Sequence, residues 1–396
     1  MLTIQQLAQK YQQEMIDDRR HLHQNPELGG AEEQTVQFIA QTLRQLGLTP
    51  KTDYSQHACS AVLEGRPGKK VILLRADIDA LPIQEQSGLP FASGKAGVMH
   101  ACGHDFHTAA LLGAARMLCD IKEQFRGRVK FCFQPAEEVK GIGACIMVQD
   151  GILENPPVDF VLGAHVTPSL PVGTVTGEAG PASAFPDSFS IAIEGVGCHG
   201  SAPHNGRDPI RAAVAAYHMI GDVSARIDAL EPHLIQVCAI NAGSAYNIVP
   251  GSAALGGTVR TLTPQSRQRC KEGIEAVCRA IEQSYGVRCK MTGFGPATPP
   301  VVNDPAYAPR ALASLGKVAA QIVSHNADRL GGEDFSFYQQ TGVPGYFVRY
   351  GVAGDDPATQ HPLHSPQFCP DERGIAIGAM IYAQMALDYL NDAESR

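Results

Sequence analysis

The chain has 396 residues, 44% of them hydrophobic, and a formal net charge of −8. At roughly 150 residues per domain, this length predicts two to three domains. Asp and Glu outnumber Lys and Arg by 40 to 32, so the chain has no basic excess with which to bind nucleic acid. The apolar content also excludes intrinsic disorder as the main feature.

Cysteine usage and the N-terminal segment predict a cytoplasmic protein. The eleven cysteines are odd in number and scattered, without a C-x-x-C pair, which favours free thiols in a reducing compartment over a disulfide framework. Residues 1–20 are polar and lack the apolar core of a signal peptide. No stretch approaches the roughly 18 apolar residues of a membrane helix, so we expect no membrane association.

The first part of the chain alternates helical and strand patterns. Apolar spacing predicts helices over 32–46 and about 105–120, and short apolar runs predict buried strands over 71–74, 129–133 and 158–162. This order predicts an α/β sheet with parallel strands. In such sheets ligands bind outside the carboxyl ends of the strands, and that is where the polar clusters of this sequence fall.

The pattern changes after Pro181. Strands are predicted over 188–194, 234–241, 253–261 and 287–292, and helices over 208–230 and 264–285, which together make a compact α+β unit. A further strand is predicted over 346–350. We therefore predict a catalytic α/β domain formed by residues 1–184 and 300–396, interrupted by an inserted domain over 185–299.

The densest polar cluster lies just before the helix at 105–120. It contains His100, Cys102, His104, Asp105 and His107. A thiolate and an imidazole on either side of a glycine can bind one metal ion from a turn. The alternative is that Asp105 caps the helix and the histidines are structural. His107 lies one helical turn further on, where we expect it to support the site.

Two further acidic clusters follow predicted strands. Adjacent carboxylates such as Glu137 and Glu138 repel unless a cation holds one of them. In a hydrolase the other carboxylate can then accept a proton from an activated water. An exposed acidic turn is the alternative. Asp77 and Asp79 follow the strand at 71–74, and a carboxylate there can fix the tautomer of a ligating histidine.

Single histidines complete the pattern. His165 and His364, each alone, are more often structural than functional. Together with Cys102, His104 and Glu138, however, they make a set of one thiol, three imidazoles and one carboxylate. This set is too large for one tetrahedral ion with an open position, and it favours two ions roughly 3.5–4 Å apart.

The sequence resembles the metal-dependent amidohydrolases of the aminoacylase/carboxypeptidase superfamily, in the branch of hippurate hydrolases, auxin-conjugate hydrolases and N-acyl-amino-acid deacylases. The matching motifs run nearly from end to end of the chain. They are RRHLH (19–23), PEL (26–28), RADIDALPIQE (75–85), GVMHACGHD (97–105), QPAEE (134–138), DPI (208–210), NIVP (247–250), GTVRT (257–261), GGEDFSFY (331–338) and LHSPQF (363–368).

The resemblance implies a dinuclear-metal, aminopeptidase-like α/β catalytic domain with an inserted α+β lid or dimerisation domain. The residues that match the family's metal ligands are Cys102, His104, Glu138, His165 and His364, with Cys102 as the bridging ligand. Glu137 matches the general base, and Asp79 the supporting carboxylate. The implied cofactor is two divalent ions per subunit, zinc or manganese, with cobalt and nickel as alternatives.

The resemblance also implies where substrate binds. His199, Asn247 and Arg260 match substrate-contacting positions, with a structural ion pair as the alternative for Arg260. Gly331 and Gly332 are expected to offer backbone N–H groups to the substrate carboxylate. A homodimer or higher homo-oligomer through the inserted domain is implied, with groups that reach the partner's site.

The implied reaction is hydrolysis of the amide bond of an N-acyl amino acid, of hippurate or N-acetyl type, with Glu137 as the general base. Three alternatives remain open: a metallopeptidase or carboxypeptidase acting on short peptides; a metal-independent cysteine hydrolase with Cys102 as nucleophile and His104 or His107 as base; and a metal-loaded binding protein. Cys198 and Phe106 depart from the family pattern, which leaves the acyl group open.

Overall fold

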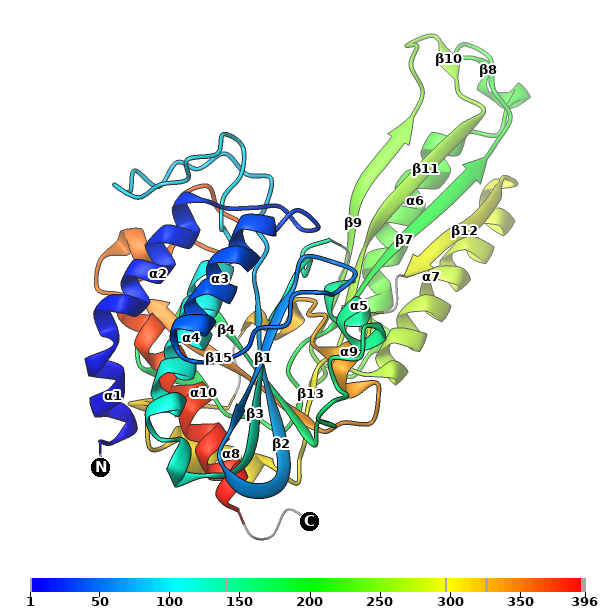
Figure 1. Cartoon of the computed structure of the whole chain (residues 1–396). Coiled ribbons are helices and arrows are strands. Elements are labelled where there is room, and N and C mark those ends of the chain that lie inside the picture. The colour runs from blue at the N-terminus through cyan, green and yellow to red at the C-terminus, as the bar shows by residue number, and fades with distance from the viewer. Residues whose placement is uncertain (1, 140–141, 296–297, 325–326, 393–396) are drawn as a thin grey trace. The chain divides into compact units, whose positions relative to one another are not determined.

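The computed structural model describes residues 2–139, 142–295, 298–324 and 327–392. The chain forms two compact units (Figure 1). The first consists of Met1–Ala182, Val301–Asp328 and Asp334–Arg396, and the second of Ser183–Pro300 and Arg329–Glu333. The first unit is therefore interrupted in sequence by the second.

A seven-stranded sheet forms the centre of the first unit. Its strand order is β1 (Cys59–Glu64), β3 (Arg126–Gln134), β2 (Arg66–Asp77), β4 (Phe160–Pro171), β15 (Gly345–Ala353), β5 (Thr174–Thr176) and β14 (Gln321–Val323). The four strands β3, β2, β4 and β15 run parallel, which confirms the predicted α/β sheet. β1 pairs with β3 in the antiparallel direction.

Helices cover both faces of this sheet, which is why the apolar runs at 71–74 and 129–133 are buried. One face packs against α1 (Ile4–Lys10), α2 (Gln12–Gln24), α3 (Glu33–Gln45), α4 (His104–Asp120), α8 (Ala308–Leu315) and α10 (Arg373–Asn391). The other face packs against α5 (Gly143–Gln149) and α9 (Ser336–Gln339). β6 (Gly180–Pro181) and β13 (Val302–Asn303) form a short separate pair.

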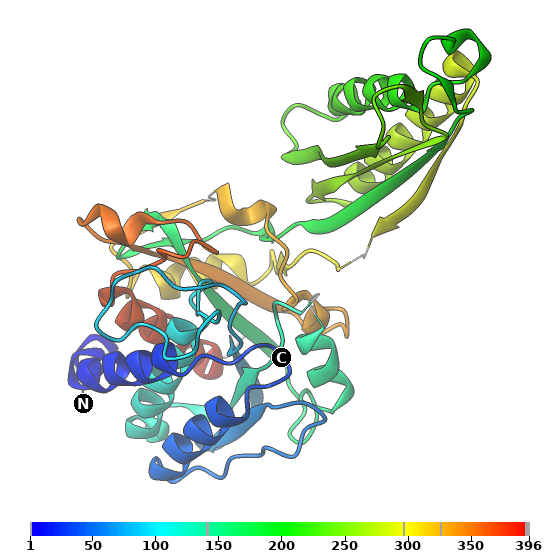
Figure 2. The same ribbon diagram turned by 90° about the horizontal axis from the view of Figure 1, so that it is seen from above.

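The second unit is a four-stranded antiparallel sheet with two helices on one face (Figure 2). The strand order is β12 (Arg288–Gly295), β7 (Phe185–Glu194), β11 (Ser252–Thr261) and β9 (His233–Ala242), and the helices are α6 (Pro209–Gly221) and α7 (Pro264–Tyr285). β8 (Cys198–His199) pairs with β10 (Ile248–Val249). The short 3-10 helices of the chain are η1 (Lys122–Gln124), η2 (Pro203–Asn205), η3 (Asp222–Arg226), η4 (Ala327–Leu330) and η5 (Pro357–Gln360).

The helix predicted over 208–230 is shorter than expected. It ends at Gly221 and is followed by η3. The chain turns there because Val223 and Ile227 are buried in the core of this unit. Gly273 of α7 leaves room for Val223, since a Cβ at this glycine would lie 2.4 Å from Val223 Cγ1. Tertiary packing therefore ends a helix that the apolar pattern would continue.

A fully buried arginine joins the carboxyl ends of two strands in the first unit. Arg75 of β2 donates to Gln134 Oε1 at the end of β3 (2.8 Å) and to Asp77 Oδ2 (2.7 Å). It also donates to Asp334 Oδ1 at 2.8 Å. Asp334 in turn accepts the N–H of Ala144 in α5 (2.8 Å). This network ties β2, β3, α5 and the segment that begins at Asp334 to one another.

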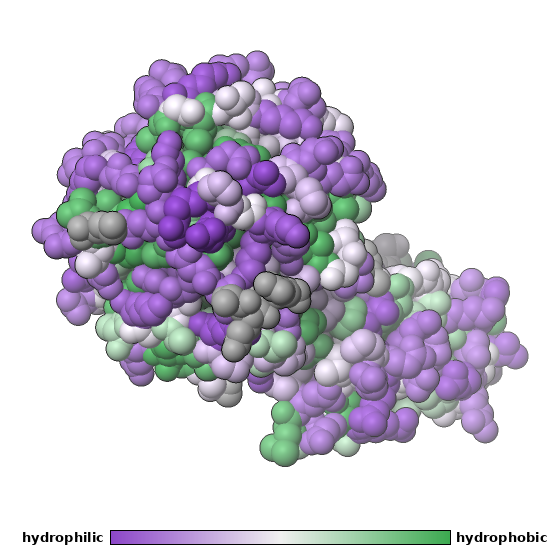
Figure 3. Space-filling model, turned by 60° about the horizontal axis from the view of Figure 1, so that its bottom comes forward, coloured by the Kyte–Doolittle hydropathy of each residue, from purple (hydrophilic) through white to green (hydrophobic). Residues whose placement is uncertain are grey.

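Among the residues that the structure describes, no helix is long and apolar enough to span a membrane. Hydrophilic residues cover most of the face in Figure 3, with hydrophobic residues between them.

Candidate metal centre and active site

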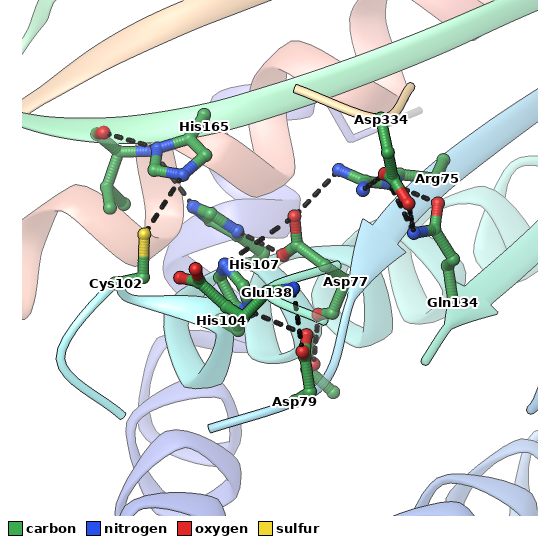
Figure 4. Close-up of polar contacts among 12 residues, drawn as sticks. Arg75, Asp77, Asp79, Cys102, His104, His107, Gln134, Glu138, His165 and Asp334 are labelled. Atoms are coloured by element: carbon green, nitrogen blue, oxygen red, sulfur yellow. Dashed lines mark hydrogen bonds and ion pairs between the residues drawn. The ribbon is translucent and has the colours of Figure 1, made fainter. Parts of the chain in front are cut away.

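Cys102 and His104 lie on the tight turn that leads into α4 (Figure 4). Gly103 between them has a φ of +84°, and a Cβ there would lie 2.5 Å from Val166 Cγ2. Glycine alone meets both conditions, because it adopts this left-handed conformation without strain and has no side chain to collide. The turn therefore brings the thiol and the imidazole close to each other.

Asp105 does not cap α4, which was the alternative interpretation of the polar cluster before this helix. Gly103 is the N-terminal cap of α4, and Asp105 lies in the first turn. Its carboxylate forms buried ion pairs with Arg19 (2.8 Å) and His23 (2.9 Å) of α2. Burial alone would raise the pKa of Asp105, but the charges of Arg19 and His23 hold it well below its usual range. The N-cap interpretation is wrong, because Gly103 caps α4 and Asp105 instead forms ion pairs that hold α2 against α4.

Asp79, just beyond the end of β2, orients His104. Its Oδ1 lies 3.1 Å from His104 Nδ1. Because a carboxylate can only accept a hydrogen bond, Nδ1 carries the proton. His104 Nε2 is buried without a hydrogen-bond partner among the described residues, and Asp77 Oδ2 is 3.8 Å away. A histidine held in this way presents its second nitrogen to a metal.

His107 lies behind the candidate ligands and supports them. Its Nδ1 donates to Asp77 Oδ1 at 2.5 Å, and its Nε2 accepts the backbone N–H of Val166 at 2.9 Å. Both ring nitrogens are therefore used, and neither is available to a metal. Since Val166 follows His165, the contacts from Arg75 through Asp77 and His107 fix the backbone beside that residue.

His165 lies within β4, although the sequence analysis placed it beyond a strand ending at residue 162. β4 continues to Pro171, but its pairing with β2 ends at Gly163. His165 therefore lies just past the part of β4 that β2 covers. Its Nδ1 donates to the backbone oxygen of Val166 (2.7 Å), and its Nε2 lies 3.6 Å from Cys102 Sγ. Burial lowers the pKa of His165, so the ring stays neutral, which is the form that binds metals.

Glu137 and Glu138 lie on a strained turn after β3. Ala136 has a φ of +54°, and His364, opposite Glu138, has a φ of +64°. Left-handed backbone at residues other than glycine costs about 1–3 kcal/mol and clusters at functional sites. Glu138 Oε1 lies 3.3 Å from His364 Nε2. The N–H of Glu138 donates to Asp79 Oδ2 (3.0 Å), so Asp79 contacts both the turn and His104.

Glu32, which the sequence analysis missed, lies against the same turn. Its Oε1 accepts the N–H of Ala136 at 2.8 Å, and its Oε2 is buried without a hydrogen-bond partner among the described residues. Burial, with a smaller contribution from the charge of Asp79, raises the pKa of Glu32 to about 7. No local sequence pattern identifies this residue, because the contact joins positions far apart in the chain.

The candidate ligand atoms form overlapping groups. Cys102 Sγ lies within 4.8 Å of ligand atoms of His104 and His165 in one group, and of Glu138 and His364 in another. A third group contains His104, Glu137 and Glu138. The structure thus brings together the five predicted ligands and the predicted base.

The chemistry of these donors fits metal ions. Burial, together with the charge of Glu138, raises the pKa of the Cys102 thiol well above its ordinary value. A thiolate at this position therefore requires a nearby cation. Two buried acceptor atoms, His104 Nε2 and Glu138 Oε1, make no hydrogen bond with the described residues, and a metal ion would satisfy both of them.

The predicted substrate-binding residues all lie in the second unit. His199 and Asn247 lie together, because the N–H of Gly200 donates to the backbone oxygen of Asn247 (2.8 Å). The ring of His199 is exposed, with Nδ1 2.8 Å from Ser201 Oγ. Gly331 and Gly332 lie beside the start of β7, where the Gly331 oxygen accepts the N–H of Ala184 (2.9 Å).

Arg260 lies near the far end of β11 from the β8–β10 pair. At about 3.3 Å per residue, the strand from Ser252 to Arg260 spans about 26 Å. The Arg260 side chain is half-buried and makes no hydrogen bond or ion pair with the residues that the structure describes. The neighbouring Asp187 instead forms a bidentate ion pair with Arg267 (2.6 and 2.9 Å). Among the described residues, the structure therefore gives Arg260 no structural ion pair.

Thiol, imidazole and carboxylate donors that gather at the carboxyl ends of parallel strands, with a second carboxylate beside them, are typical of a metal-dependent hydrolase. Residues 73–388 match the model of peptidase family M20/M25/M40. The chain belongs to this family.

Relatives and solved structures agree with this assignment. The chain is 38% identical to an N-acetyl-L-cysteine deacetylase of Bacillus subtilis over 387 residues, 97% of this chain and 90% of the relative. It is 36% identical to thermostable carboxypeptidase 2 of Saccharolobus solfataricus over 380 residues, 95% of each chain. A dinuclear metal binding peptidase of the M20 family from Bacillus subtilis has a TM-score of 0.83 and 34% identity, with 96% of this chain and 99% of that chain covered.

The raised pKa of Glu32 predicts that the free energy of unfolding depends on pH. In the folded, metal-free chain this pKa is about 7, against an ordinary 4.5, so Glu32 retains a proton that the unfolded chain loses first. The resulting stabilisation is complete below about pH 4.5 and is lost as the pH rises through about 7. We expect the melting temperature of metal-free Glu32→Gln, relative to metal-free wild type, to increase from about pH 5 to about pH 8. Thermal unfolding followed by circular dichroism measures this difference, and a difference that does not change with pH would contradict the raised pKa.

Proposed function

We propose that the chain is a metal-dependent deacylase that hydrolyses the amide bond of an N-acyl amino acid, of N-acetyl or hippurate type, to a carboxylic acid and an amino acid. The observation that carries this proposal is the position of Glu137 beside a buried Cys/His/Glu donor set. The similarity to an N-acetyl-L-cysteine deacetylase supports the substrate class.

The proposed cofactor is two divalent ions. Cys102 belongs both to the group with His104 and His165 and to the group with Glu138 and His364, so these five residues would hold the ions. A mixed set of sulfur, nitrogen and oxygen donors suits zinc or manganese, with cobalt and nickel as alternatives. When bound, the ions supply positive charge that lowers the pKa of the attacking water and polarises the amide carbonyl.

Glu137 is the proposed general base. Glu138 lies against His364, and Asp79 accepts hydrogen bonds from His104 and from the N–H of Glu138. Through these contacts, Asp79 positions His104 and the turn, and Glu138 is placed to act as a metal ligand. Glu137 then accepts the proton of the attacking water and delivers it to the leaving amine nitrogen.

The substrate carboxylate is assigned to Arg260. A guanidinium can form two parallel hydrogen bonds with a carboxylate, and that of Arg260 makes no ion pair or hydrogen bond with the residues that the structure describes. The backbone N–H groups of Gly331 and Gly332 are proposed to assist. His199, with Asn247 beside it, is proposed to polarise the scissile carbonyl. One copy of the chain cannot present both Arg260 and His199 to one small substrate, because about 26 Å of β11 separates their positions. We therefore assign the two groups to different active sites of a homodimer.

The second unit carries a surface suited to such a dimer. β9 is an edge strand of its sheet, and Leu234 and Ile240 on it are exposed. Ile210, Val214 and Tyr217 form an exposed apolar row on α6, which packs against β9. A second copy can cover this surface about a twofold axis, so that the two β9 strands pair and neither edge stays open.

Two alternative activities lead to different experimental outcomes. Carboxypeptidase is the activity named for the second relative, and parallel assays with N-acyl amino acids and dipeptides decide between the two substrates. A cysteine hydrolase is disfavoured, because burial and the charge of Glu138 keep the Cys102 thiol protonated. A neutral thiol is a weak nucleophile.

Replacement of the proposed base is expected to abolish turnover without loss of metal. Glu137→Gln removes the proton acceptor, and general base catalysis contributes about 10²–10⁴-fold to the rate. We expect kcat for N-acetyl and N-benzoyl amino acids to fall by that factor while elemental analysis still finds the metal of the wild type. Glu123→Gln, an exposed carboxylate on η1, is the matched control. Wild-type turnover by Glu137→Gln would show that the base is misassigned.

Metal removal is expected to abolish the hydrolytic activity, and restoration of the metal is expected to recover it. Dialysis against a chelator should abolish hydrolysis, and addition of zinc or manganese should restore it, with about two ions bound per chain. A cysteine hydrolase would behave in the opposite way: chelation would leave its activity intact, and a thiol-alkylating reagent alone would remove it.

Charges on the proposed dimer surface are expected to separate the subunits. The variant carrying both Val214→Glu and Ile240→Glu should sediment as a monomer, because a buried unpaired carboxylate opposes association. Leu312→Glu, at an exposed apolar position on α8, should sediment as the wild type does. A monomeric wild-type chain would refute the dimer, and so would a double variant that still dimerises.

A further inference from the structure

The turn that carries Glu137 is held by a hydrogen bond on each side of that residue. On one side, Asp79 Oδ2 accepts the N–H of Glu138 at 3.0 Å. On the other side, Glu32 Oε1 accepts the N–H of Ala136 at 2.8 Å. Asp79 has an expected supporting role at the metal centre, whereas Glu32 lies in none of the polar clusters that the sequence analysis singled out.

The backbone of this turn needs such support. Ala136 has a φ of +54°, and an L-residue there is less stable than in the right-handed region by about 1–2 kcal/mol. Relaxation of Ala136 to an ordinary conformation would rotate the following peptide and move the Glu137 side chain. An acceptor placed at the Ala136 N–H favours the strained conformation, because relaxation would break that hydrogen bond and leave a buried donor unpaired.

The segment that carries Glu32 is itself fixed against the turn. A Cβ at Gly29 would lie 2.4 Å from Val139 Cγ2 and 3.1 Å from both Ala136 Cα and Asp79 Oδ2. Residues 29–32 therefore pack directly on the turn, at a distance that only glycine permits. The N–H of Ala80 also donates to the backbone oxygen of Glu27 (2.7 Å), which ties this segment to the chain just after Asp79.

The surroundings of Glu32 argue against a role in an ion pair. Its side chain is 0% exposed, and its second oxygen has no hydrogen-bond partner among the described residues. The adjacent Glu33, by contrast, is exposed and accepts a hydrogen bond from Gln37 of its own helix (3.3 Å). Burial of the Glu32 carboxyl group costs free energy. This buried group accepts the hydrogen bond from the backbone of the turn at Ala136.

We propose that Glu32 is a positioning residue for hydrolysis: by accepting the N–H of Ala136, it holds the left-handed turn so that Glu137 stays where it can transfer the proton. This inference rests on the proposed role of Glu137 as general base. Glu32 touches neither substrate nor metal in this scheme and acts through the backbone alone.

The test compares three variants of the metal-loaded enzyme by steady-state kinetics. Glu32→Ala removes the acceptor, and we expect kcat to fall by about 10–100-fold, as for other groups that support an active site from behind. KM and metal content should stay close to wild type, because the proposed ligands and Arg260 are unchanged. Glu32→Gln keeps an amide oxygen for the same N–H and should retain kcat within about threefold of the wild type, a change of less than 1 kcal/mol. Glu33→Ala, the exposed neighbour, should leave kcat and KM unchanged.

Two results would overturn the proposal: a wild-type kcat in Glu32→Ala, or an equal loss of kcat in Glu32→Ala and Glu32→Gln. Should Glu32→Ala fail to fold, Glu32→Asp replaces it, because the shorter side chain withdraws its oxygens from Ala136 and should cause the same loss of kcat. If the wild type hydrolyses no N-acyl amino acid, the proposed function fails, and amide hydrogen exchange at Ala136 decides the inference separately. Faster exchange in Glu32→Ala than in Glu32→Gln supports it, and equal exchange overturns it.

Discussion

The site in the first unit depends on one buried positive charge, the guanidinium of Arg75. It faces Asp77 and Asp334 at 2.7 and 2.8 Å, with all three side chains fully buried. Burial would raise the pKa of Asp77, but its interactions with His104, Arg75 and His107 hold it well below its usual range. Loss of one partner from such a network leaves a buried charge uncompensated, which typically costs about 3–5 kcal/mol. Through Asp77, the network fixes His107 and hence the backbone next to His165.

Negative charge dominates the surroundings of the candidate ligands. The carboxylates that converge there come from Asp77, Asp79, Glu137 and Glu138, whereas Arg75 is the fixed positive charge in their network. Histidines held by carboxylates are also better electron donors to a metal. The excess of acceptors therefore favours binding of divalent cations, while Asp77 and Asp79 hold the histidines His107 and His104.

Local sequence patterns were enough to predict part of this arrangement. The parallel sheet follows from short apolar runs alternating with helical patterns, since a strand buried on both faces has no polar side. Cys102 and His104 were predictable because a glycine turn before a helix holds both donors within three consecutive residues. Asp79 was predictable as a support because it follows a strand that ends beside them.

Other features depend on contacts between distant segments, which no local pattern encodes. Glu32 acquires its role only because residues 29–32 pack on the turn at Ala136. β4 continues past Gly163, whereas its pairing with β2 ends there. His165 therefore lies just beyond the part of β4 that β2 covers. Asp105 lies in the first turn of α4 rather than at its cap, and it pairs with Arg19 of another helix. In each case a partner far along the chain outweighs the local preference.

The last of the proposed ligands, His364, has a consequence for biosynthesis. The other four lie between Cys102 and His165, and the whole second unit is translated before His364 emerges. During synthesis, the first four proposed ligands therefore precede the fifth by the time needed to make about two hundred residues, at about 5–20 residues per second. The proposed ligand set is complete only when the last part of the chain adds His364, β15 and α10 to the first unit.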